Sequence, residues 1–271
     1  MSQEIQPDWD KIAEKFDLFL PQLRPVGDAM MHALKAEKGE SILDVATGTG
    51  EPALSLARNF GDTISLVCVD AADGMVNAAR AKAEKEGLIG VEFKTMPAES
   101  LRLADNYFDC VTCRFGVMLF QDPQSGLNEM FRVLKPGGRI VLAVWHLPDS
   151  MTTMKWAYSV FEGRIPEDRY PPLKIATSLG GDGILSSMLE SAGFGQVQTE
   201  IMTFHYEFNS FDDYWQLTLD SGILDNQLQL LKSGEVEEVR GELAELAKDF
   251  EKDGVFRVPH NFVLASARKS S

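Results

Sequence analysis

Five short apolar runs alternate with helical segments between residues 41 and 145, and this alternation constrains the fold more than any other feature. The runs cover residues 41–46, 64–70, 91–96, 108–115 and 139–145. Strands that alternate with helices form βαβ units and a parallel sheet. The runs are apolar nearly throughout instead of alternating with polar residues, as expected for strands covered on both faces. The sequence therefore predicts an α/β fold with a mostly parallel, Rossmann-like sheet.

Helical segments flank these runs. The first 40 residues are expected to form two helices, of which the second covers 26–36 and follows Pro25. The first helix carries an apolar stripe of Trp9, Ile12, Phe16 and Phe19. After residue 146 the pattern predicts helices over 151–163 and 183–192, a sixth strand over 196–208, a helical segment over 209–258 and a seventh strand over 261–269.

A glycine-rich loop follows the first apolar run. Gly48-x-Gly50-x-x-Ala53 leads from this strand into a helix, and Asp70 ends the second strand, 20 residues after Gly50. Small residues let the backbone approach a ligand, and a carboxylate at the end of the second strand takes ribose hydroxyls. Enzymes that use NAD, FAD or S-adenosylmethionine share this loop, so it does not select among them.

Two carboxylates favour a cofactor without phosphate. Glu51 stands at the start of the helix that would receive a pyrophosphate, and it would repel that group. Asp44 lies inside the first strand, where a charge is costly unless it is paired. It could fix the loop amides or, through water, the ammonium of a methionine moiety. S-adenosylmethionine has no phosphate, so it does not conflict with Glu51.

Four motifs in order resemble those of class I S-adenosylmethionine-dependent methyltransferases, nearest the branch of the ubiquinone/menaquinone-biosynthesis (UbiE-like) C-methyltransferases. They are Ile42-Leu-Asp-Val-Ala-Thr-Gly-Thr-Gly50, Val69-Asp70 with Met75, Phe108-Asp-Cys-Val111 and Met130-Phe-Arg-Val-Leu-Lys-Pro-Gly-Gly138. The resemblance implies a seven-stranded sheet with the last strand antiparallel and helices on both faces. It also implies that S-adenosyl-L-methionine binds at the carboxyl ends of the first strands.

The resemblance assigns cofactor contacts to positions of this chain that match the family motifs. Towards the methionine moiety and ribose these are Asp44, Ala46, Gly48, Gly50 and Asp70, towards the adenine Ala71, Met75, Ala98 and Glu99, and at the end of the fourth strand Arg114 and Phe115. Phe16 takes the place of a tyrosine that is common in the N-terminal helix of the family, and it is a candidate substrate contact.

The predicted elements divide a single domain over residues 1–271 into parts with different roles. The parts are an N-terminal helical cap over 1–40, a cofactor-binding core over 41–146, the remainder of the core over 147–208 and 259–271, and a helical, lid-like insertion over 209–258 between strands six and seven. Because a parallel sixth strand ends at the carboxyl edge of the sheet, this insertion must emerge on the cofactor side. Its Tyr214 and Trp215 could wall an apolar substrate pocket.

The expected reaction is in-line methyl transfer to a small molecule, with a carbon or an oxygen as the acceptor atom. Where the quinone enzymes carry an Arg-Asn pair, this chain has Val117-Met-Leu-Phe120, so quinone is not assigned as the substrate. A general base is needed only for some acceptors, and His146, just past the fifth strand, is the candidate. The alternatives are an NAD(P)-dependent oxidoreductase and a catalytically silent protein that only binds the cofactor.

Charge and cysteine content limit the remaining possibilities. The net charge is −15, and the insertion over 209–258 alone holds 12 acidic against five basic residues, so we expect no nucleic-acid partner. Cys110 and Cys113 form a C-x-x-C pair within a strand, where the two side chains point to opposite faces, so we expect structural thiols and no metal site. The N-terminus lacks a signal peptide and no run could span a bilayer, which predicts a cytoplasmic protein. An apolar helix stripe leaves a homodimer open.

Overall fold

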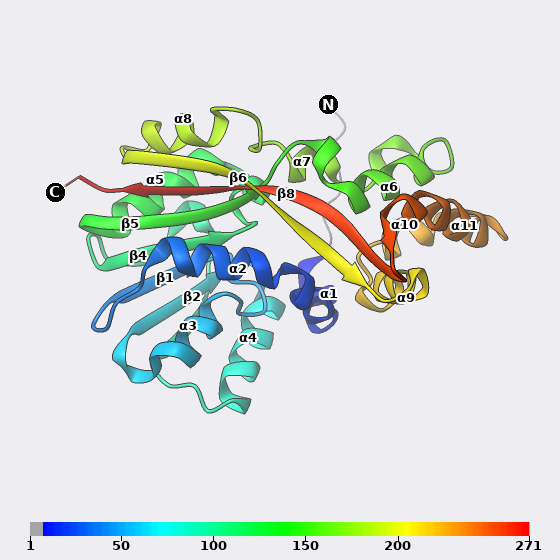
Figure 1. Ribbon diagram of the computed structural model, residues 1–271. Helices are drawn as coiled ribbons and strands as arrows, with labels where there is room; N and C mark the ends of the chain where they lie inside the picture. Colours follow the sequence, from blue (N-terminus) through cyan, green and yellow to red (C-terminus); the bar gives the residue numbers. More distant parts are fainter. Residues whose placement is uncertain (1–7, 271) are drawn as a thin grey trace.

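Seven strands and a two-residue eighth form one twisted sheet in the computed structural model, which describes residues 8–270 (Figure 1). The order across the sheet is β3-β2-β1-β4-β5-β8-β6, and β8 runs antiparallel to both of its long neighbours. The strands are β1 Ser41–Val45, β2 Ser65–Asp70, β3 Val91–Thr95, β4 Phe108–Arg114, β5 Leu134–Trp145, β6 Gly195–Phe208, β7 Glu251–Lys252 and β8 Val255–Arg268. The predicted fold class is confirmed, with β7 as an addition.

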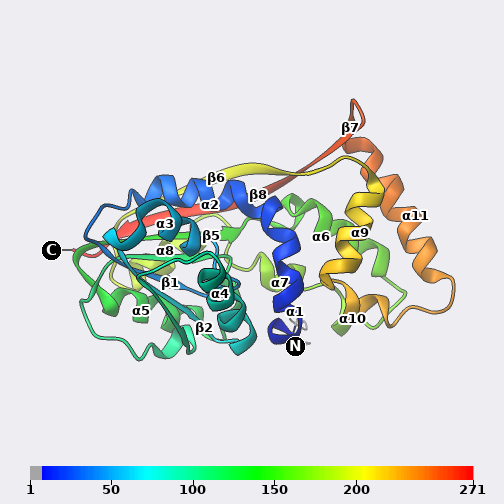
Figure 2. The same ribbon diagram turned by 90° about the horizontal axis from the view of Figure 1, so that it is seen from below.

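Helices cover both faces of the sheet. Helices α2 and α3 lie against one face, and α5 and α8 lie against the other (Figures 1 and 2). The helices are α1 Trp9–Phe16, α2 Leu20–Leu34, α3 Ala53–Phe60, α4 Asp73–Lys85, α5 Pro123–Val133, α6 Thr152–Phe161, α7 Leu173–Ala176, α8 Ile184–Ser191, α9 Phe211–Ser221, α10 Asp225–Leu228 and α11 Glu235–Ala247. No helix within residues 8–270 is both long enough and apolar enough to cross a bilayer.

The central strands are apolar because both of their faces are buried. Ile42 and Leu43 of β1 are fully buried, and so are the thiols of Cys110 and Cys113 in β4. The two cysteines are unpaired, and burial raises the pKa of both thiols. The prediction that this C-x-x-C pair is structural and buried is confirmed.

Strands β6 and β8 extend beyond the rest of the sheet. Pairing between β5 and β8 stops at Trp145 opposite Phe262, whereas β6 and β8 remain paired as far as Phe208 opposite Phe256. This two-stranded extension carries α9, α10 and α11, and α6 and α7 lie beside them at the same end of the molecule (Figures 1 and 2). We call these five helices the cap helices.

Three predicted starts were wrong. The fifth strand was expected to begin at residue 139 but begins at Leu134, because Leu134 already pairs with Phe108 of β4. Helix α2 was expected to begin after Pro25 but begins at Leu20 and includes Pro25, because burial of Leu23, Val26, Met30 and Leu34 along one side outweighs one lost hydrogen bond. Strand β8 was expected to begin at residue 261 but begins at Val255, because β6 offers pairing partners past the edge of the main sheet.

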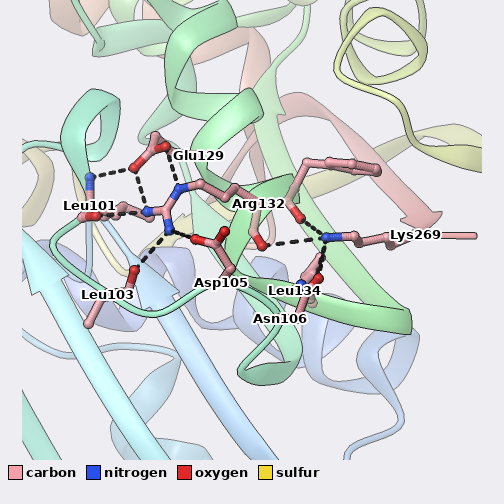
Figure 3. Close-up of polar contacts among 9 residues, drawn as sticks. Leu101, Leu103, Asp105, Asn106, Glu129, Arg132, Leu134 and Lys269 are labelled. Atoms are coloured by element: carbon pink, nitrogen blue, oxygen red, sulfur yellow. Dashed lines mark hydrogen bonds and ion pairs between the residues drawn. The ribbon is translucent and has the colours of Figure 1, made fainter.

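Two basic side chains fasten the end of α5 to neighbouring segments (Figure 3). Arg132 donates to both carboxylate oxygens of Glu129 at 2.7 and 2.8 Å and to the carbonyls of Leu101 at 2.8 Å and Leu103 at 2.9 Å. Glu129 in turn accepts a hydrogen bond from the Leu101 amide at 2.8 Å. Lys269, near the end of the chain, donates to the carbonyls at the end of α5. The segment after β3 is thereby held against α5.

We predict that the Arg132→Met variant loses about 2 kcal/mol of unfolding free energy, because it leaves a partly buried carboxylate and two carbonyls without their charged donor. Urea unfolding measures this change. Arg24→Met is the matched control, because Arg24 forms an exposed pair with Asp28 and should cost less than about 0.5 kcal/mol. Equal losses in the two variants would contradict the prediction.

Candidate active site

The loop after β1 is bent sharply at the carboxyl end of the sheet. Three of its residues have positive φ values, namely 53° at Ala46, 55° at Gly48 and 108° at Gly50. Residues other than glycine rarely adopt this left-handed region. Asp70, at the end of β2, holds the loop in place. Its Oδ2 accepts a hydrogen bond from the Gly48 amide at 2.9 Å, and its Oδ1 accepts one from the Ala72 amide at 3.0 Å. Burial raises the pKa of this carboxyl group, while the backbone donors oppose the shift.

The two glycines of the loop have different surroundings. A Cβ on Gly48 would meet nothing within 4 Å, and Gly48 lines the cavity described below. A Cβ on Gly50 would lie 2.6 Å from a methyl carbon of Leu54, so the absence of a side chain at Gly50 lets α3 approach the loop. Gly50, expected to contact the cofactor, is not among the residues that line the cavity.

Asp44 is 1% exposed and lies in β1 directly before this loop. Its Oδ1 accepts a hydrogen bond from the Thr112 hydroxyl of β4 at 2.6 Å. The described residues offer its Oδ2 no partner, and burial raises the pKa of Asp44 to about 6. The loop amide that Asp44 was expected to fix is instead bound by Asp70.

Glu51 satisfies donors of the first turn of α3. Its carboxylate accepts hydrogen bonds from the Ser55 amide at 3.2 Å and the Ser55 hydroxyl at 2.7 Å, and it pairs with Arg58 at 2.5 Å. A diphosphate at this helix start would meet a carboxylate in place of free amides. The contact therefore disfavours the NAD(P)-dependent alternative.

A cavity of about 940 Å³ opens above the loop and extends beneath the cap helices. Nine of the 11 predicted cofactor residues line it, namely Ala46, Gly48, Asp70, Ala71, Met75, Ala98, Glu99, Arg114 and Phe115. We call these residues the floor of the cavity. Of the predicted substrate residues, Phe16 and Tyr214 line the cavity, whereas Trp215 is buried elsewhere.

The opposite side of the cavity, which we call the roof, is mainly apolar and comes from segments far apart in the sequence. The roof residues that were not predicted as site residues from the sequence are Phe19, Leu23, Met151, Thr153, Met154, Ala157, Pro172, Ala176, Tyr206, Thr218, Ile223 and Leu224. Met151, Met154 and Ala157 share one side of α6 at helical spacing, which is the signal that could have indicated a lining surface. The sequence could not show what this surface faces.

His146 does not reach the cavity. Its Nδ1 lies 3.2 Å from the Ser150 hydroxyl, and it is not among the lining residues. The structure therefore does not bring this candidate base together with the floor residues. His260 of β8 instead contacts residues of the cavity wall. His260 is 1% exposed and contacts Thr153 and Tyr206, which both line the cavity.

An aromatic stack forms one wall. Phe115 lies face to face with Trp145, with ring centroids 3.9 Å apart and an angle of 6° between the rings. Phe204 lies beyond Trp145 at 5.9 Å, and Tyr206 stacks on His260 at 4.1 Å. Phe115 has a φ of 56°, and such strained residues persist where the surroundings hold them and are enriched at functional sites.

Arg114 brings a positive charge to the cavity. It ends β4, is half-buried, and has neither a hydrogen bond nor an ion pair among residues 8–270. Burial lowers the pKa of its guanidinium, although nearby Asp44 and Glu51 oppose the shift. A cation that lines a cavity and makes no ion pair or hydrogen bond of its own favours a ligand with an anionic group.

The floor fits S-adenosylmethionine, the cofactor that the resemblance implies. Three buried oxygens beside or within the loop have no hydrogen-bond partner among the described residues, namely Asp44 Oδ2, Thr47 Oγ1 and Thr49 Oγ1. Such buried atoms cost about 1–3 kcal/mol each unless a ligand or water supplies a donor. Asp44 lies behind the cavity lining, so the ammonium of the methionine moiety would supply it with charge and, through water, with donors. The carboxylate of the same moiety suits Arg114, which lines the cavity.

Comparison with known proteins agrees with this fit. Residues 3–206 match the model of the ubiE/COQ5 methyltransferase family. The chain is 33% identical over 221 residues to the demethylmenaquinone methyltransferase of Bacteroides fragilis, a match that covers 75% of this chain and 89% of the relative. It is 35% identical over 170 residues to the ubiquinone/menaquinone biosynthesis C-methyltransferase of Geobacter sulfurreducens, covering 60% of this chain and 66% of the relative.

A solved structure supports the fold. The phosphoethanolamine N-methyltransferase 2 of Haemonchus contortus, in complex with S-adenosyl-L-methionine, superimposes with a TM-score of 0.62 at 17% identity. The match covers 97% of this chain and 57% of that chain. At this identity the likeness concerns the architecture alone.

We predict that the affinity for S-adenosylhomocysteine depends on the ionisation of Asp44. The pKa of Asp44 is raised to about 6, so the carboxyl group is mostly neutral below that pH and cannot attract the ligand's ammonium. Affinity should therefore rise about tenfold from about pH 5 to about pH 7 and then level off. Calorimetric titration measures this dependence.

The Asp44→Asn variant should bind more weakly and with little dependence on pH over the same range. Asp28→Asn is the control, because Asp28 is exposed and should keep the wild-type dependence. A slope that persists in Asp44→Asn would assign the titration to another group.

Proposed function

The chain belongs to the ubiE/COQ5 methyltransferase family and is an S-adenosylmethionine-dependent methyltransferase, and from this we propose that it methylates a ring carbon of an apolar phenolic or quinol-type small molecule. The relatives named above, from Bacteroides fragilis and Geobacter sulfurreducens, take their names from menaquinone and ubiquinone biosynthesis. The apolar roof over the polar floor is the observation that carries the proposal.

The shape of the cavity supports a bulky, apolar acceptor. Its volume of about 940 Å³ is near the upper end of ordinary ligand sites, which leaves room for a second molecule beside the cofactor. Met118 and Leu119, in the segment where the quinone enzymes carry a polar pair, line the cavity here. The acceptor therefore meets methionine, leucine and aromatic side chains, and the stack of Phe115 on Trp145 suits a flat ring.

No histidine lines the cavity among residues 8–270, and this bears on the kind of acceptor. His146 lies outside the cavity lining, and the Tyr206 hydroxyl stays protonated because burial raises its pKa, so it cannot take up a proton as a base. An acceptor that needs no strong base must be nucleophilic itself. The ring carbon next to a phenolic oxygen meets this requirement, which favours carbon methylation.

The chain's own residues orient the two molecules and exclude water. S-adenosylmethionine supplies the methyl group on a sulfonium, which needs no further activation. Asp70 fixes the loop and would bind the ribose hydroxyls. Arg114 would bind the carboxylate of the methionine moiety, and Asp44 would bind its ammonium through water. The roof encloses the acceptor in an apolar space, where the approach of its nucleophilic carbon can be aligned.

We predict that the full chain transfers labelled methyl from S-adenosylmethionine to a reduced 2-prenyl-1,4-naphthoquinone, with the label on the ring carbon. Mass spectrometry of the products identifies the methylated position. Phosphoethanolamine is the contrasting acceptor and should give no product, because its phosphate and ammonium would be desolvated under the roof. Methylation of phosphoethanolamine, or of neither compound, would contradict the proposed acceptor class.

We predict separately that Arg114→Met weakens S-adenosylhomocysteine binding about tenfold or more, because a charge-assisted hydrogen bond in a buried site is lost. The affinity for 5′-methylthioadenosine should change little, since that ligand lacks the amino acid carboxylate. Arg114→Lys, which keeps the charge, should lose less than Arg114→Met. An unchanged S-adenosylhomocysteine affinity together with a raised acceptor KM would show instead that Arg114 binds the acceptor.

A further inference from the structure

Thr153, in the first turn of α6, meets His260 of β8 at the wall of the cavity. Thr153 lines the cavity and is half-buried, whereas His260 is 1% exposed. The Thr153 amide donates to Nε2 of His260 at 3.2 Å, and the Thr153 hydroxyl lies 2.9 Å from the same nitrogen. Thr153 belongs to the roof and is not among the floor residues assigned to the cofactor, which places the pair on the acceptor side.

The proton positions of the pair follow from its neighbours. The Val258 carbonyl can only accept, and it lies 3.1 Å from Nδ1 of His260, so Nδ1 carries a proton. The Thr153 amide can only donate, so Nε2 must present its lone pair. His260 is therefore neutral, with its proton on Nδ1. Burial lowers the pKa of His260 to about 4, which agrees with a neutral ring.

The Thr153 hydroxyl must then donate its proton to Nε2. A threonine hydroxyl has one O–H and two lone pairs, so its donor is used and its acceptor capacity remains. Among residues 8–270 this oxygen accepts no other hydrogen bond. Because Thr153 lines the cavity, its lone pairs are available to a ligand there.

The surroundings keep the pair in this arrangement. His260 stacks on Tyr206 at 4.1 Å with an angle of 28° between the rings. The backbones of Met151 and His260 form a β-bridge, and the Thr152 hydroxyl donates to the Pro259 carbonyl at 2.6 Å. The first turn of α6 is thus fastened to β8, and rotation of the Thr153 hydroxyl would break its bond to His260.

We propose that Thr153 selects an acceptor that carries a hydroxyl group, by accepting a hydrogen bond from that group. His260 is then a positioning residue, because its Nε2 accepts the proton of the Thr153 hydroxyl and leaves that oxygen only its acceptor role. This inference rests on the proposed function for the ring class of the acceptor and adds the donor group that the ring must bear. A phenol satisfies the lone pair of Thr153, whereas an ether or a ketone has no proton to offer. A phenol that donates a hydrogen bond has a more electron-rich oxygen, which makes its neighbouring ring carbon a better nucleophile.

His260 also accepts a hydrogen bond from the Thr153 amide, so it could act only as a structural cap of α6. A purely structural role would change stability, and it would not make binding depend on whether a ligand carries a hydroxyl or a methoxy group. The experiment therefore measures that difference.

The probes are 1-naphthol and 1-methoxynaphthalene, titrated calorimetrically into the full chain saturated with S-adenosylhomocysteine. The wild type should bind 1-naphthol roughly five- to tenfold more tightly than 1-methoxynaphthalene, because one hydrogen bond usually changes an affinity by about that factor. Thr153→Ser keeps the hydroxyl and should retain this preference. Thr153→Val has nearly the same shape without the hydroxyl and should reduce the preference to within about twofold.

His260→Asn should also reduce the preference, and it should have no further effect in the Thr153→Val background, because His260 acts through Thr153. Nitrogen NMR of the wild-type histidines should show His260 neutral and protonated on Nδ1 near neutral pH. This measurement needs no ligand and does not depend on whether the variants fold.

A preference for 1-naphthol that persists in Thr153→Val would overturn the inference alone, and so would a His260 protonated on Nε2. Equal binding of the two probes by the wild type would also overturn it, while leaving the ring acceptor intact. Failure to bind either probe would remove the proposed ring acceptor and the inference together, so the two failures are distinguishable.

Discussion

Parallel pairing of β1 with both β2 and β4 is the constraint on which the site depends. The chain leaves β1 towards one face of the sheet and leaves β4 towards the other, so a crevice opens where the two connections diverge. Asp70, at the end of β2, holds the loop beside this crevice by accepting a hydrogen bond from the Gly48 amide. The floor residues come from the ends of strands and the loops after them, so their positions follow from the register of the sheet.

The roof depends on a second pairing. Strand β8 inserts between β5 and β6, and the β6–β8 extension beyond Trp145 carries α9, α10 and α11, as Figure 1 shows. The extension also brings His260 and Tyr206 under the cap helices, next to Thr153 of α6. A polar floor and an apolar roof therefore face each other because two separate strand pairings end at the same edge.

Buried polar groups in the site fall into two kinds. Thr153 and His260 satisfy each other and leave one acceptor directed to the cavity, whereas Asp44, Thr47 and Thr49 each retain an oxygen without a partner among the described residues. A satisfied pair can specify a ligand's geometry at little cost, while orphaned oxygens destabilise the empty protein until a ligand binds. The same polar groups that lower stability thus provide binding energy for a charged cofactor.

The sequence by itself determined the sheet, the loop and the cofactor, because these depend on local patterns. Apolar runs specify buried strands, positive φ favours glycine as at Gly48, and the second strand ends on Asp70 whatever the cap helices do. For this reason nine predicted floor residues lie together. Gly50 and Asp44 do not line the cavity, since the same spacing serves helix packing and burial equally well.

Only the tertiary structure decided what lies above the floor. The wall that carries the further inference is built from distant segments, since more than a hundred residues separate Met151 from His260. No local pattern in the sequence shows that β8 runs past Trp145 and brings His260 beneath α6. For the same reason His146, which sequence position favoured, turns to Ser150 and not to the cavity. The direction of a side chain at the end of a strand depends on the residues that pack against that side chain, and these residues are often distant in the sequence.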